Sequence, residues 1–290
     1  MAHCPQQDKT GSTLGRYDII LGMGKELTKL VVLIRGGGEV ASGVAHRLAL
    51  AQLRVCLTEI PNPQAVSRGV AFSEAIYDGK KEIEGVVARH VTSAPGITKA
   101  WQEGEIPIII DPQASIKSTL NPEVLVDAIM AKRNLGTRLT DAPLVIGLGS
   151  GFSAGKDVHM VVETNNSQSL GRVILKGGAE KDSGAPIAID GLTFERVLHS
   201  PKDGLFETDK KIGDTAIAGE EIAAVAGQPL KAEIGGVIRA LLRRGAKVAK
   251  GTKLGEIDPS GNKDAGFTIR DRIRAIAEGV LAAIRMRYNI

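Results

Sequence analysis

The sequence predicts an α/β protein in which a Rossmann-like parallel-sheet domain is followed by a β-rich repeat domain and a C-terminal helix. Three observations predict this arrangement. A pattern of strand, glycine turn, helix and strand runs from Leu30 to Glu59. After Gly171, short apolar runs punctuated by glycine repeat at an offset of 32 residues. A helical pattern with one apolar face runs from Phe267 to Tyr288.

The composition is typical of a soluble globular protein of about two domains. The chain has 290 residues, of which 43% are hydrophobic and 24% charged. Aromatic residues make up only 3%, and the basic residues behind the net charge of +4 are dispersed, which argues against nucleic-acid binding. No run of 18 apolar residues and no signal peptide is found, so we expect a cytoplasmic protein that does not bind membranes. The cysteines, Cys4 and Cys56, form no C-x-x-C pair, and no metal site is expected.

The glycine turn is the first candidate for ligand binding. The apolar run Leu30 to Ile34 predicts a strand, and Gly36, Gly38 and Ala41 match the G-x-G-x-x-A form of the dinucleotide fingerprint. Glu59 lies 23 residues after Gly36, near the position of a ribose-binding carboxylate. Glycines let a phosphate approach backbone N–H groups, and the helix that follows favours negative charge. A tight turn without a ligand is the alternative.

A second glycine loop, Gly147 to Gly155, follows the predicted buried strand Leu144 to Ile146. It does not match a P-loop, because that motif requires a glycine at Ser150 and a serine or threonine at Asp157. The loop is still suited to form an anion-binding nest. Both glycine loops are expected at the same edge of one parallel sheet, where they would face one crevice.

A further candidate, Asp111, ends the buried run Ile106 to Ile110 and is expected at the same edge. Arg68 is suited either to an anion there or to an ordinary salt bridge. No catalytic residue is assigned. The candidate ligand-binding residues are Gly36, Gly37, Gly38, Glu39, Ser42, Glu59, Asp111, Gly149, Ser150, Gly151, Ser153, Gly155 and Lys156.

Other segments of the first domain are predicted from local signals. Helices are expected at Phe72 to Tyr77 and at Pro95 to Gln102, and Gly85 to Thr92 is expected as a strand or a helix end. A further helix is expected from Pro122 to about Lys132, because Asn121 is a good cap and proline suits the first helical position.

The β-rich part consists of two copies of one unit. Neither copy could bury its apolar face alone, so the two are expected to interlock. The pattern resembles the barrel-sandwich hybrid of biotinyl and lipoyl domains. Lys231 at the junction VAGQPLKAEIGG lacks the usual flanking residues of a modified lysine, so neither biotin nor lipoate is expected. The glycines that recur are Gly204, Gly213 and Gly219, which reappear as Gly236, Gly245 and Gly251.

These patterns divide the chain into four parts: an N-terminal extension at 1–29, a Rossmann-like ligand-binding domain at 30–170, a barrel-sandwich-hybrid-like domain at 171–262 and a C-terminal helical part at 263–290. The C-terminal helix is expected to pack back on the first domain or on a partner subunit. Thr268 and Asp271 approximate a capping box at its start.

Several motifs in one order resemble the YqeB family of selenium-dependent molybdenum hydroxylase system proteins and, more distantly, accessory proteins of xanthine dehydrogenase. The resemblance covers about Val31 to Ile284. It implies an accessory role in enzyme maturation, with molybdenum cofactor or a related phosphate-bearing nucleotide held between the glycine loops. The implied partners are a molybdenum hydroxylase and cofactor-maturation proteins, and the chain could form a homo-oligomer. The motifs are IRGGGEVASGVAHRL, PQAVSRGVAFSEAI, IPIIIDP, VIGLGSGFSAGKDVHMVVET, SLGRVI and GTKLGEIDP.

The chain departs from the family pattern in three places. Ser150 stands where the family usually has proline, and Ser260 stands where a basic residue is common. Residues Asn165 to Ser169 replace an Arg-Gly-His element. The last change removes an anion-binding arginine and a proton-carrying histidine.

Two other functions fit the sequence. An NAD-dependent oxidoreductase is supported by the fingerprint and Glu59, although no catalytic Ser-Tyr-Lys set or His-Asp pair can be assigned. A non-catalytic docking module for a molybdenum enzyme is supported by the repeat domain.

Overall fold

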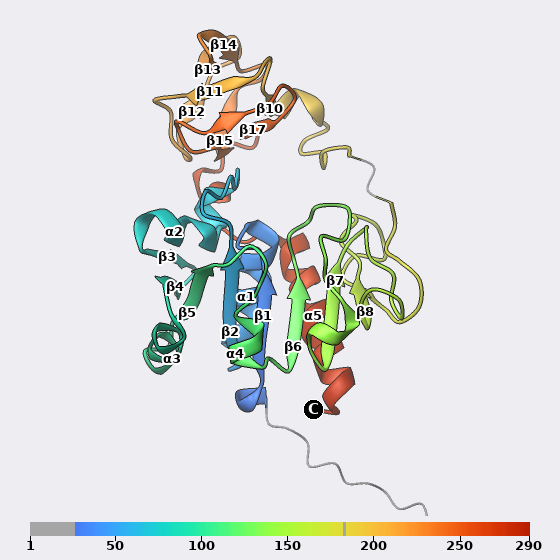
Figure 1. The fold of residues 1–290 in the computed structure, drawn as a ribbon. Coiled ribbons are helices and arrows are strands. Elements are labelled where there is room, and N and C mark those ends of the chain that lie inside the picture. Colours follow the sequence, from blue (N-terminus) through green and yellow to red (C-terminus); the bar gives the residue numbers. More distant parts are fainter. Residues whose placement is uncertain (1–26, 182–183) are drawn as a thin grey trace, which may run out of the picture.

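A nine-stranded, mostly parallel sheet forms the larger part of the molecule, and two antiparallel sheets lie above the carboxyl ends of its strands (Figure 1). The computed structural model describes residues 27–181 and 184–290. Most of the predicted N-terminal extension therefore lies outside the described residues, and Leu27–Lys29 forms a 3₁₀ turn before the first strand. The structure confirms an α/β molecule with a large sheet, an antiparallel β part and a C-terminal helix.

The large sheet has the strand order β3-β4-β5-β2-β1-β6-β7-β8-β9. The strands from β4 to β8 are parallel, and β3 and β9 pair antiparallel at the two edges. The carboxyl ends of β2, β1, β6 and β7 therefore lie together at one edge. The strands are β1 (Val31–Arg35), β2 (Arg54–Glu59), β3 (Lys80–Ile83), β4 (Val86–Val91), β5 (Ile106–Ile110), β6 (Val124–Asp127), β7 (Leu144–Leu148), β8 (Met160–Val162) and β9 (Val173–Ile174).

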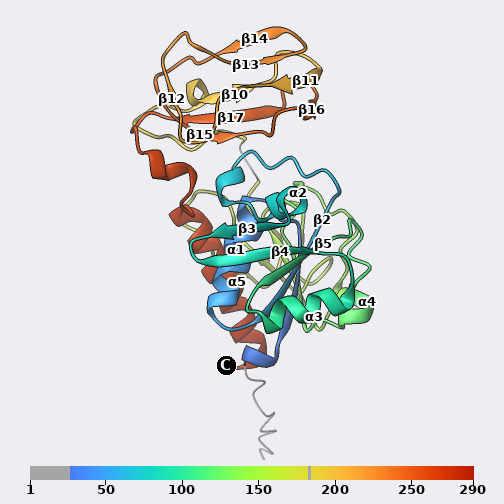
Figure 2. The ribbon, with the colours of Figure 1, turned by 90° about the vertical axis from the view of Figure 1, so that its left-hand side faces the viewer.

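Helices cover both faces of this sheet. α1 and α5 pack against each other on one face, and α3 and α4 lie on the other (Figure 2). The predicted apolar face of α5 is buried, with Ile273, Ile276, Val280 and Ile284 inaccessible to solvent. No helix among the described residues is both long and apolar enough to cross a membrane. The helices are α1 (Glu39–Leu50), α2 (Ala75–Asp78), α3 (Ala94–Gln102), α4 (Lys117–Leu120) and α5 (Asp271–Tyr288).

Most predicted elements of the first domain are present. The predicted strands at Leu30, Ile106 and Leu144 correspond to β1, β5 and β7, and the predicted helix at Pro95 corresponds to α3. The segment from Gly85 to Thr92 is the strand β4, and the predicted helix from Phe72 is a 3₁₀ turn (Phe72–Glu74) continued by α2. Cys56 is fully buried within β2.

The predicted helix from Pro122 to Lys132 is wrong. Its centre is the strand β6, which pairs with β1 on one side and β7 on the other and is buried throughout. Two β-branched valines, Val124 and Val126, favour this central strand position. Asn121 has a left-handed conformation and ends α4 instead of starting a helix. The local capping signal was therefore overridden by burial within the sheet.

The predicted capping box of the C-terminal helix is also wrong. α5 begins at Asp271, and Arg270 is its N-cap residue, without a side-chain cap. The Thr268 hydroxyl donates to the Asp264 carbonyl (3.0 Å) in the preceding turn.

The two repeat units interlock as predicted. β11, β12 and β13 of the first unit correspond, at the offset of 32, to β15, β16 and β17 of the second. β11 pairs with β16, and β15 pairs with β12, so each unit completes the sheet of the other. β9 belongs to the large sheet, so the antiparallel part begins only at β10. Its strands are β10 (Val197–His199), β11 (Gly204–Glu207), β12 (Thr215–Ala216), β13 (Glu221–Val225), β14 (Gln228–Lys231), β15 (Gly236–Leu241), β16 (Lys247–Val248) and β17 (Lys253–Asp258).

A prediction follows from the close approach of α5 to the large-sheet domain. A Cβ on Gly279 would overlap the Gly171 carbonyl oxygen and approach Val162 Cγ1 to 2.8 Å. Gly279→Ala gains about 1 kcal/mol of helix propensity, but we expect overpacking to cost more. The net result is a lower free energy of unfolding, measured by urea denaturation. The control Glu278→Ala, which changes an exposed residue next to it, should cost less than about 1 kcal/mol. A Gly279→Ala variant more stable than wild type would contradict this packing.

Candidate functional site

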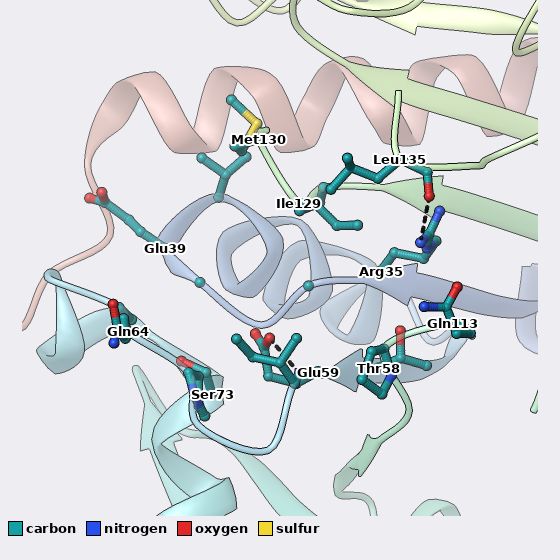
Figure 3. Close-up of a pocket in the computed structure, with 18 residues that line it drawn as sticks. Arg35, Glu39, Thr58, Glu59, Gln64, Ser73, Gln113, Ile129, Met130 and Leu135 are labelled. Atoms are coloured by element: carbon teal, nitrogen blue, oxygen red, sulfur yellow. Dashed lines mark hydrogen bonds between the residues drawn. The ribbon is translucent and has the colours of Figure 1, made fainter. Parts of the chain in front are cut away.

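A cavity of about 880 Å³ opens at the carboxyl ends of β1, β2, β5 and β6 (Figure 3). Such a volume is suited to a small-molecule ligand. Its apolar walls come mainly from the loops after β2 and β6. Its polar lining residues are Arg35, Glu39, Thr58, Glu59, Gln64, Ser73 and Gln113.

The three glycines of the turn after β1 have different roles. Gly36 has a φ of +98°, which favours glycine, and a Cβ there would lie 3.0 Å from the Ala128 carbonyl oxygen. A Cβ on Gly37 would lie 3.0 Å from Ile108 Cδ1 and 3.2 Å from Glu59 Oε2. A Cβ on Gly38 would meet no protein atom within 4 Å. Packing and backbone conformation therefore explain Gly36 and Gly37, whereas Gly38 borders open space in the cavity.

The start of α1 is exposed to this cavity. Gly38 is the N-cap residue and Glu39 the first helical residue, and both line the cavity. Within the described part of the chain, no side chain caps this helix end. The first N–H groups of a helix carry partial positive charge, so this end is suited to an anionic group.

Glu59 ends β2 and borders both the glycine turn and the cavity. Its Oε2 accepts from the Gly37 N–H (2.7 Å) and its Oε1 from the Ile60 N–H (2.8 Å). Burial raises the pKa of Glu59, and these two hydrogen bonds partly oppose that shift. A carboxylate has about four acceptor positions, so Glu59 retains capacity to accept from ligand hydroxyl groups.

Two serines tie the glycine turn to the 3₁₀ turn at Phe72. The Ser42 hydroxyl donates to the Gly37 carbonyl (3.0 Å) and accepts from the Phe72 N–H (2.7 Å). The Ser73 N–H also donates to the Gly37 carbonyl (2.8 Å). Ser42, a predicted ligand residue, thus supports the turn. The Ser73 hydroxyl is buried in the cavity lining and has no hydrogen-bond partner among the described residues.

Sequence analysis did not assign Ser73 to the site, because nothing in its local pattern distinguishes it.

Arg35 is a second polar group that sequence analysis did not assign to the site. It lines the cavity, and its NH1 donates to Asp127 Oδ2 (3.2 Å) at the end of β6 and to the Thr137 hydroxyl. The contact between Arg35 and Asp127 forms because Asp127 ends the strand β6, and the sequence predicts a helix for this segment.

The carboxylate of Asp111 does not line the cavity. Its Oδ2 accepts from the Ile116 N–H (2.7 Å) and closes a turn after β5. The next residues, Pro112 and Gln113, line the cavity instead. Arg68 donates to the Leu241 carbonyl (2.7 Å) and pairs with Glu74, so it links the two parts of the molecule.

The later half of the second glycine loop is closed by its own hydrogen bonds. The N–H groups of Ser153, Gly155 and Lys156 donate to Asp157 Oδ2, the Val158 carbonyl and the Ser153 carbonyl. The Gly149 N–H likewise donates to the Val162 carbonyl (2.9 Å). These groups are therefore not available to an anion in this conformation.

Gly151 and Ser150 have different surroundings from the rest of this loop. A Cβ on Gly151 would lie 2.6 Å from the Arg133 backbone nitrogen, so Gly151 supports the segment after β6. Ser150 lines a second cavity of about 640 Å³, and Met130 lines both cavities. The expected single crevice between the two glycine loops is thus replaced by two cavities on either side of the segment after β6.

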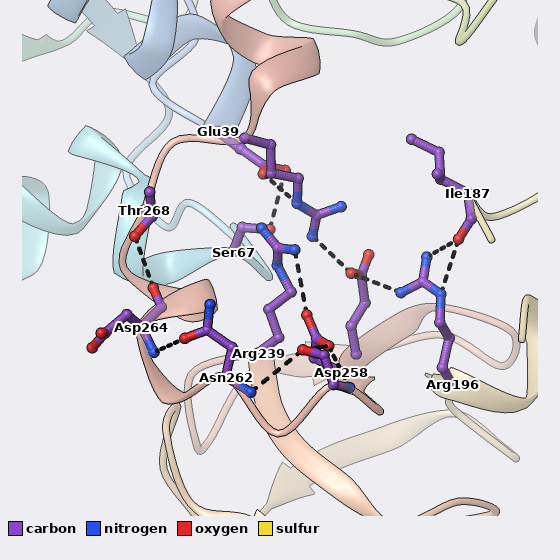
Figure 4. Close-up of polar contacts among 12 residues, drawn as sticks. Glu39, Ser67, Ile187, Arg196, Arg239, Asp258, Asn262, Asp264 and Thr268 are labelled. Carbon is purple, nitrogen blue, oxygen red and sulfur yellow. Dashed lines mark hydrogen bonds and ion pairs between the residues drawn. The ribbon is translucent and has the colours of Figure 1, made fainter. Parts of the chain in front are cut away.

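A chain of charged side chains connects the start of α1 to the antiparallel part (Figure 4). Glu39 accepts from the Ser67 hydroxyl (3.1 Å) and pairs with Arg270 (3.1 Å), the residue before α5. Arg270 also pairs with Glu256 of β17 (2.7 Å), and Glu256 pairs with Arg196 (3.2 Å). Glu39 alone would repel an anion at this end of α1. The pairing with Arg270 offsets its negative charge.

Glu256 is the centre of this chain of charges. Burial alone would raise its pKa, but the charges of Arg270, Lys253 and Arg196 outweigh burial and hold the pKa well below its ordinary value of 4.5. Among the described residues, no three His, Cys, Asp or Glu side chains form a group that could hold a metal ion.

Comparison with known proteins identifies the family. Over 256 residues the chain is 43% identical to the uncharacterized protein YqeB of Escherichia coli (strain K12). The chain belongs to the YqeB family. The match covers 88% of the chain and 47% of the YqeB protein, so the chain spans about half the length of this relative. No protein-family model matches the chain.

Solved structures show only weak overall similarity to this YqeB-family chain. TcdA (CsdL) has a TM-score of 0.33 at 11% identity, covering 91% of this chain and 90% of that one. The product-bound ectoine utilization protein EutE (DoeB) of Ruegeria pomeroyi has a TM-score of 0.24 at 15% identity, covering 79% and 85%. With TM-scores this low, neither similarity supports an assignment.

Glu256 provides a pH-dependent prediction. Glu256→Gln leaves Arg196 and Arg270 without their shared counter-charge, so we expect the free energy of unfolding at pH 7 to fall by about 3 kcal/mol. Because the pKa of Glu256 is lower in the folded than in the unfolded chain, its contribution is present above pH 4.5 and is lost as the pH falls below that value. The difference between the two proteins should therefore shrink on acidification.

Urea unfolding between pH 7 and about pH 3 measures this difference. Glu207→Gln is the control, since it alters an exposed pair with Arg244 in the same domain and should change stability by less than about 1 kcal/mol. A wild-type advantage over Glu256→Gln that is independent of pH would contradict the proposed ionisation.

Proposed function

We propose that the chain binds a phosphate-bearing nucleotide or molybdopterin-type ligand in the 880 Å³ cavity, and that it acts as a cytoplasmic accessory protein in the maturation of selenium-dependent molybdenum hydroxylases. The observation that carries the binding proposal is Gly38, which borders open space at the uncapped start of α1. The maturation role is supported by the resemblance described for the sequence. The implied partners are a molybdenum hydroxylase and cofactor-maturation proteins.

The strand order supports a dinucleotide-type binding mode. We infer that β5-β2-β1-β6-β7-β8 corresponds to a Rossmann-like order, with the cavity where the order reverses between β1 and β6. We also infer that the two antiparallel sheets form a barrel-sandwich hybrid, because the repeat units exchange strands symmetrically.

Each group of the cavity has a role in this proposal. The N–H groups at Gly38 and Glu39 face a phosphate, and the Ser73 hydroxyl donates a hydrogen bond to it. The Glu59 carboxylate accepts from hydroxyl groups of the ligand. Apolar residues of the walls, such as Ile60 and Ile129, contact its ring. This arrangement replaces the expected crevice between two glycine loops by a site at the first loop.

An NAD-dependent oxidoreductase is a second candidate, and Glu59 at the end of β2 favours it. The chemistry of the cavity favours binding without catalysis. The ionisable side chains among the described residues that line it are Arg35, Glu39 and Glu59. The described lining contains no histidine, lysine, tyrosine or cysteine, side chains that often donate a proton to a carbonyl group.

Gly38→Val tests the proposed site. The backbone of Gly38 has a φ of −71°, which valine adopts without strain, and no protein atom opposes the new side chain. The variant should fold normally and lose binding by tenfold or more, a loss of about 1.4 kcal/mol, because the side chain occupies the position of the phosphate. Native mass spectrometry of small molecules retained by the purified protein, followed by titration with molybdenum cofactor, measures the effect.

Gly235→Val is the matched control for this experiment. A Cβ at Gly235 makes only ordinary contacts, at 3.6 Å or more, in the antiparallel part. Its binding should equal that of wild type. Unchanged binding by Gly38→Val would exclude the start of α1 as the phosphate site.

Glu59 makes a separate prediction about nucleotide selectivity. The Glu59 carboxylate can accept from the 2′-hydroxyl of NAD, whereas a 2′-phosphate lacks that donor and is repelled, so NAD should raise the melting temperature more than NADP does. Thermal shift with NAD, NADH, NADP and NADPH measures this. The preference should be reduced in Glu59→Gln. No shift with any of the four would argue against the oxidoreductase and leave a pterin-type ligand.

A further inference from the structure

The second cavity lies between the large-sheet domain and the antiparallel domain. Its walls include Ser150 after β7, Asn165 after β8, and Lys253 of β17. A neighbouring cavity of about 410 Å³ shares Arg196 and Arg270 with it. The two cavities adjoin along these residues, and together they are called the interdomain cleft here.

Cationic side chains outnumber carboxylates among the residues that line this interdomain cleft, although Asp258, which pairs with Arg239, offsets part of their charge. Its carboxylate-bearing lining residues are Glu180, Glu256 and Asp271. Its cationic lining residues are Lys132, Arg196, Arg239, Lys253, Arg270 and Arg272. A cleft with low-dielectric walls concentrates the field of such charges, so it attracts anions more strongly than the same charges on a flat surface.

Three cationic side chains surround the single carboxylate of Glu256. Arg196, Arg270 and Lys253 all pair with this one carboxylate, and its side chain is only 4% exposed. Arg270 shares a second carboxylate, Glu39. Lys253 differs from the two arginines because its side chain, although paired with Glu256, is 41% exposed and lines the cleft, where a ligand can contact it.

Neutral hydrogen-bond donors complete the lining. Ser150 belongs to the second glycine loop, and Asn165 and Asn166 follow β8. Such groups orient an anion that the cations attract. The volume of the cleft is suited to a small molecule.

We propose that the interdomain cleft binds a small molecule with two or more adjacent negative charges, such as a diphosphate or a polycarboxylate, with Lys253 as a direct contact. The site is separate from the cavity at Gly38. Because its walls come from both domains, an anion there also stabilises their relative arrangement.

Isothermal titration calorimetry of the full chain with pyrophosphate tests this inference, and citrate in a second titration distinguishes phosphate from carboxylate ligands. We expect at least one of them to bind, with an affinity that falls as the salt concentration rises. Lys253→Gln should weaken binding by about tenfold, as expected for the loss of one charge-assisted hydrogen bond. Lys253→Arg, which keeps the charge, should retain most of the affinity.

Lys250→Gln is the matched control, because Lys250 is exposed on the same domain and does not line the cleft. Its affinity for pyrophosphate or citrate should equal that of wild type. Absence of binding of both anions would overturn the inference, as would equal affinities of wild type and Lys253→Gln. Binding lost in Gly38→Val but kept in Lys253→Gln would place the anion at the start of α1 and overturn it as well.

Discussion

The packing of α5 against α1 is the constraint on which the arrangement of the molecule depends. The chain leaves the large sheet after β9, forms the antiparallel domain and then returns through α5 to the first domain. α5 approaches α1 so closely that a Cβ on Gly43 would overlap the Ile273 side chain. Because the antiparallel domain is bounded by these two connections, it lies over the carboxyl ends of the strands, where the cavity opens (Figure 1).

This packing also brings the starts of two helices together. Glu39 begins α1, and Arg270 directly precedes α5, although the two residues are 231 positions apart in the sequence. Carboxylates near helix starts are favourable, and Glu39 has a second stabilising partner in Arg270. Arg270 in turn reaches Glu256 of the antiparallel domain. Two ion pairs thus connect the start of α1 to that domain.

The sequence predicted those features that depend on local patterns. The glycine turn, α1 and the apolar face of α5 follow from spacing within one element, and the interlocking of the repeat follows from the inability of one unit to bury itself. The wrong or missing predictions concern contacts between residues that are far apart in the sequence. Val124 to Asp127 forms a central strand, which is buried between β1 and β7. Asn121 and Pro122 are local helix-start signals and contain no information about that burial. The contacts of Ser73 and Glu256 likewise depend on tertiary packing.

The two glycine loops show why a glycine motif alone does not identify a ligand site. Gly36 and Gly151 have positive φ angles and approach backbone atoms of the segment after β6, so the fold itself requires both. In the second loop, the N–H groups of Gly149, Ser153 and Gly155 donate to protein oxygens. Gly38 has neither a positive φ nor a close neighbour, so neither conformation nor packing explains it. A glycine that the fold does not require, at the uncapped start of a helix and beside a buried serine without a partner, is the stronger evidence for a ligand. By this criterion the first loop is the stronger candidate for the proposed ligand site, whereas Ser150 of the second loop lines the interdomain cleft.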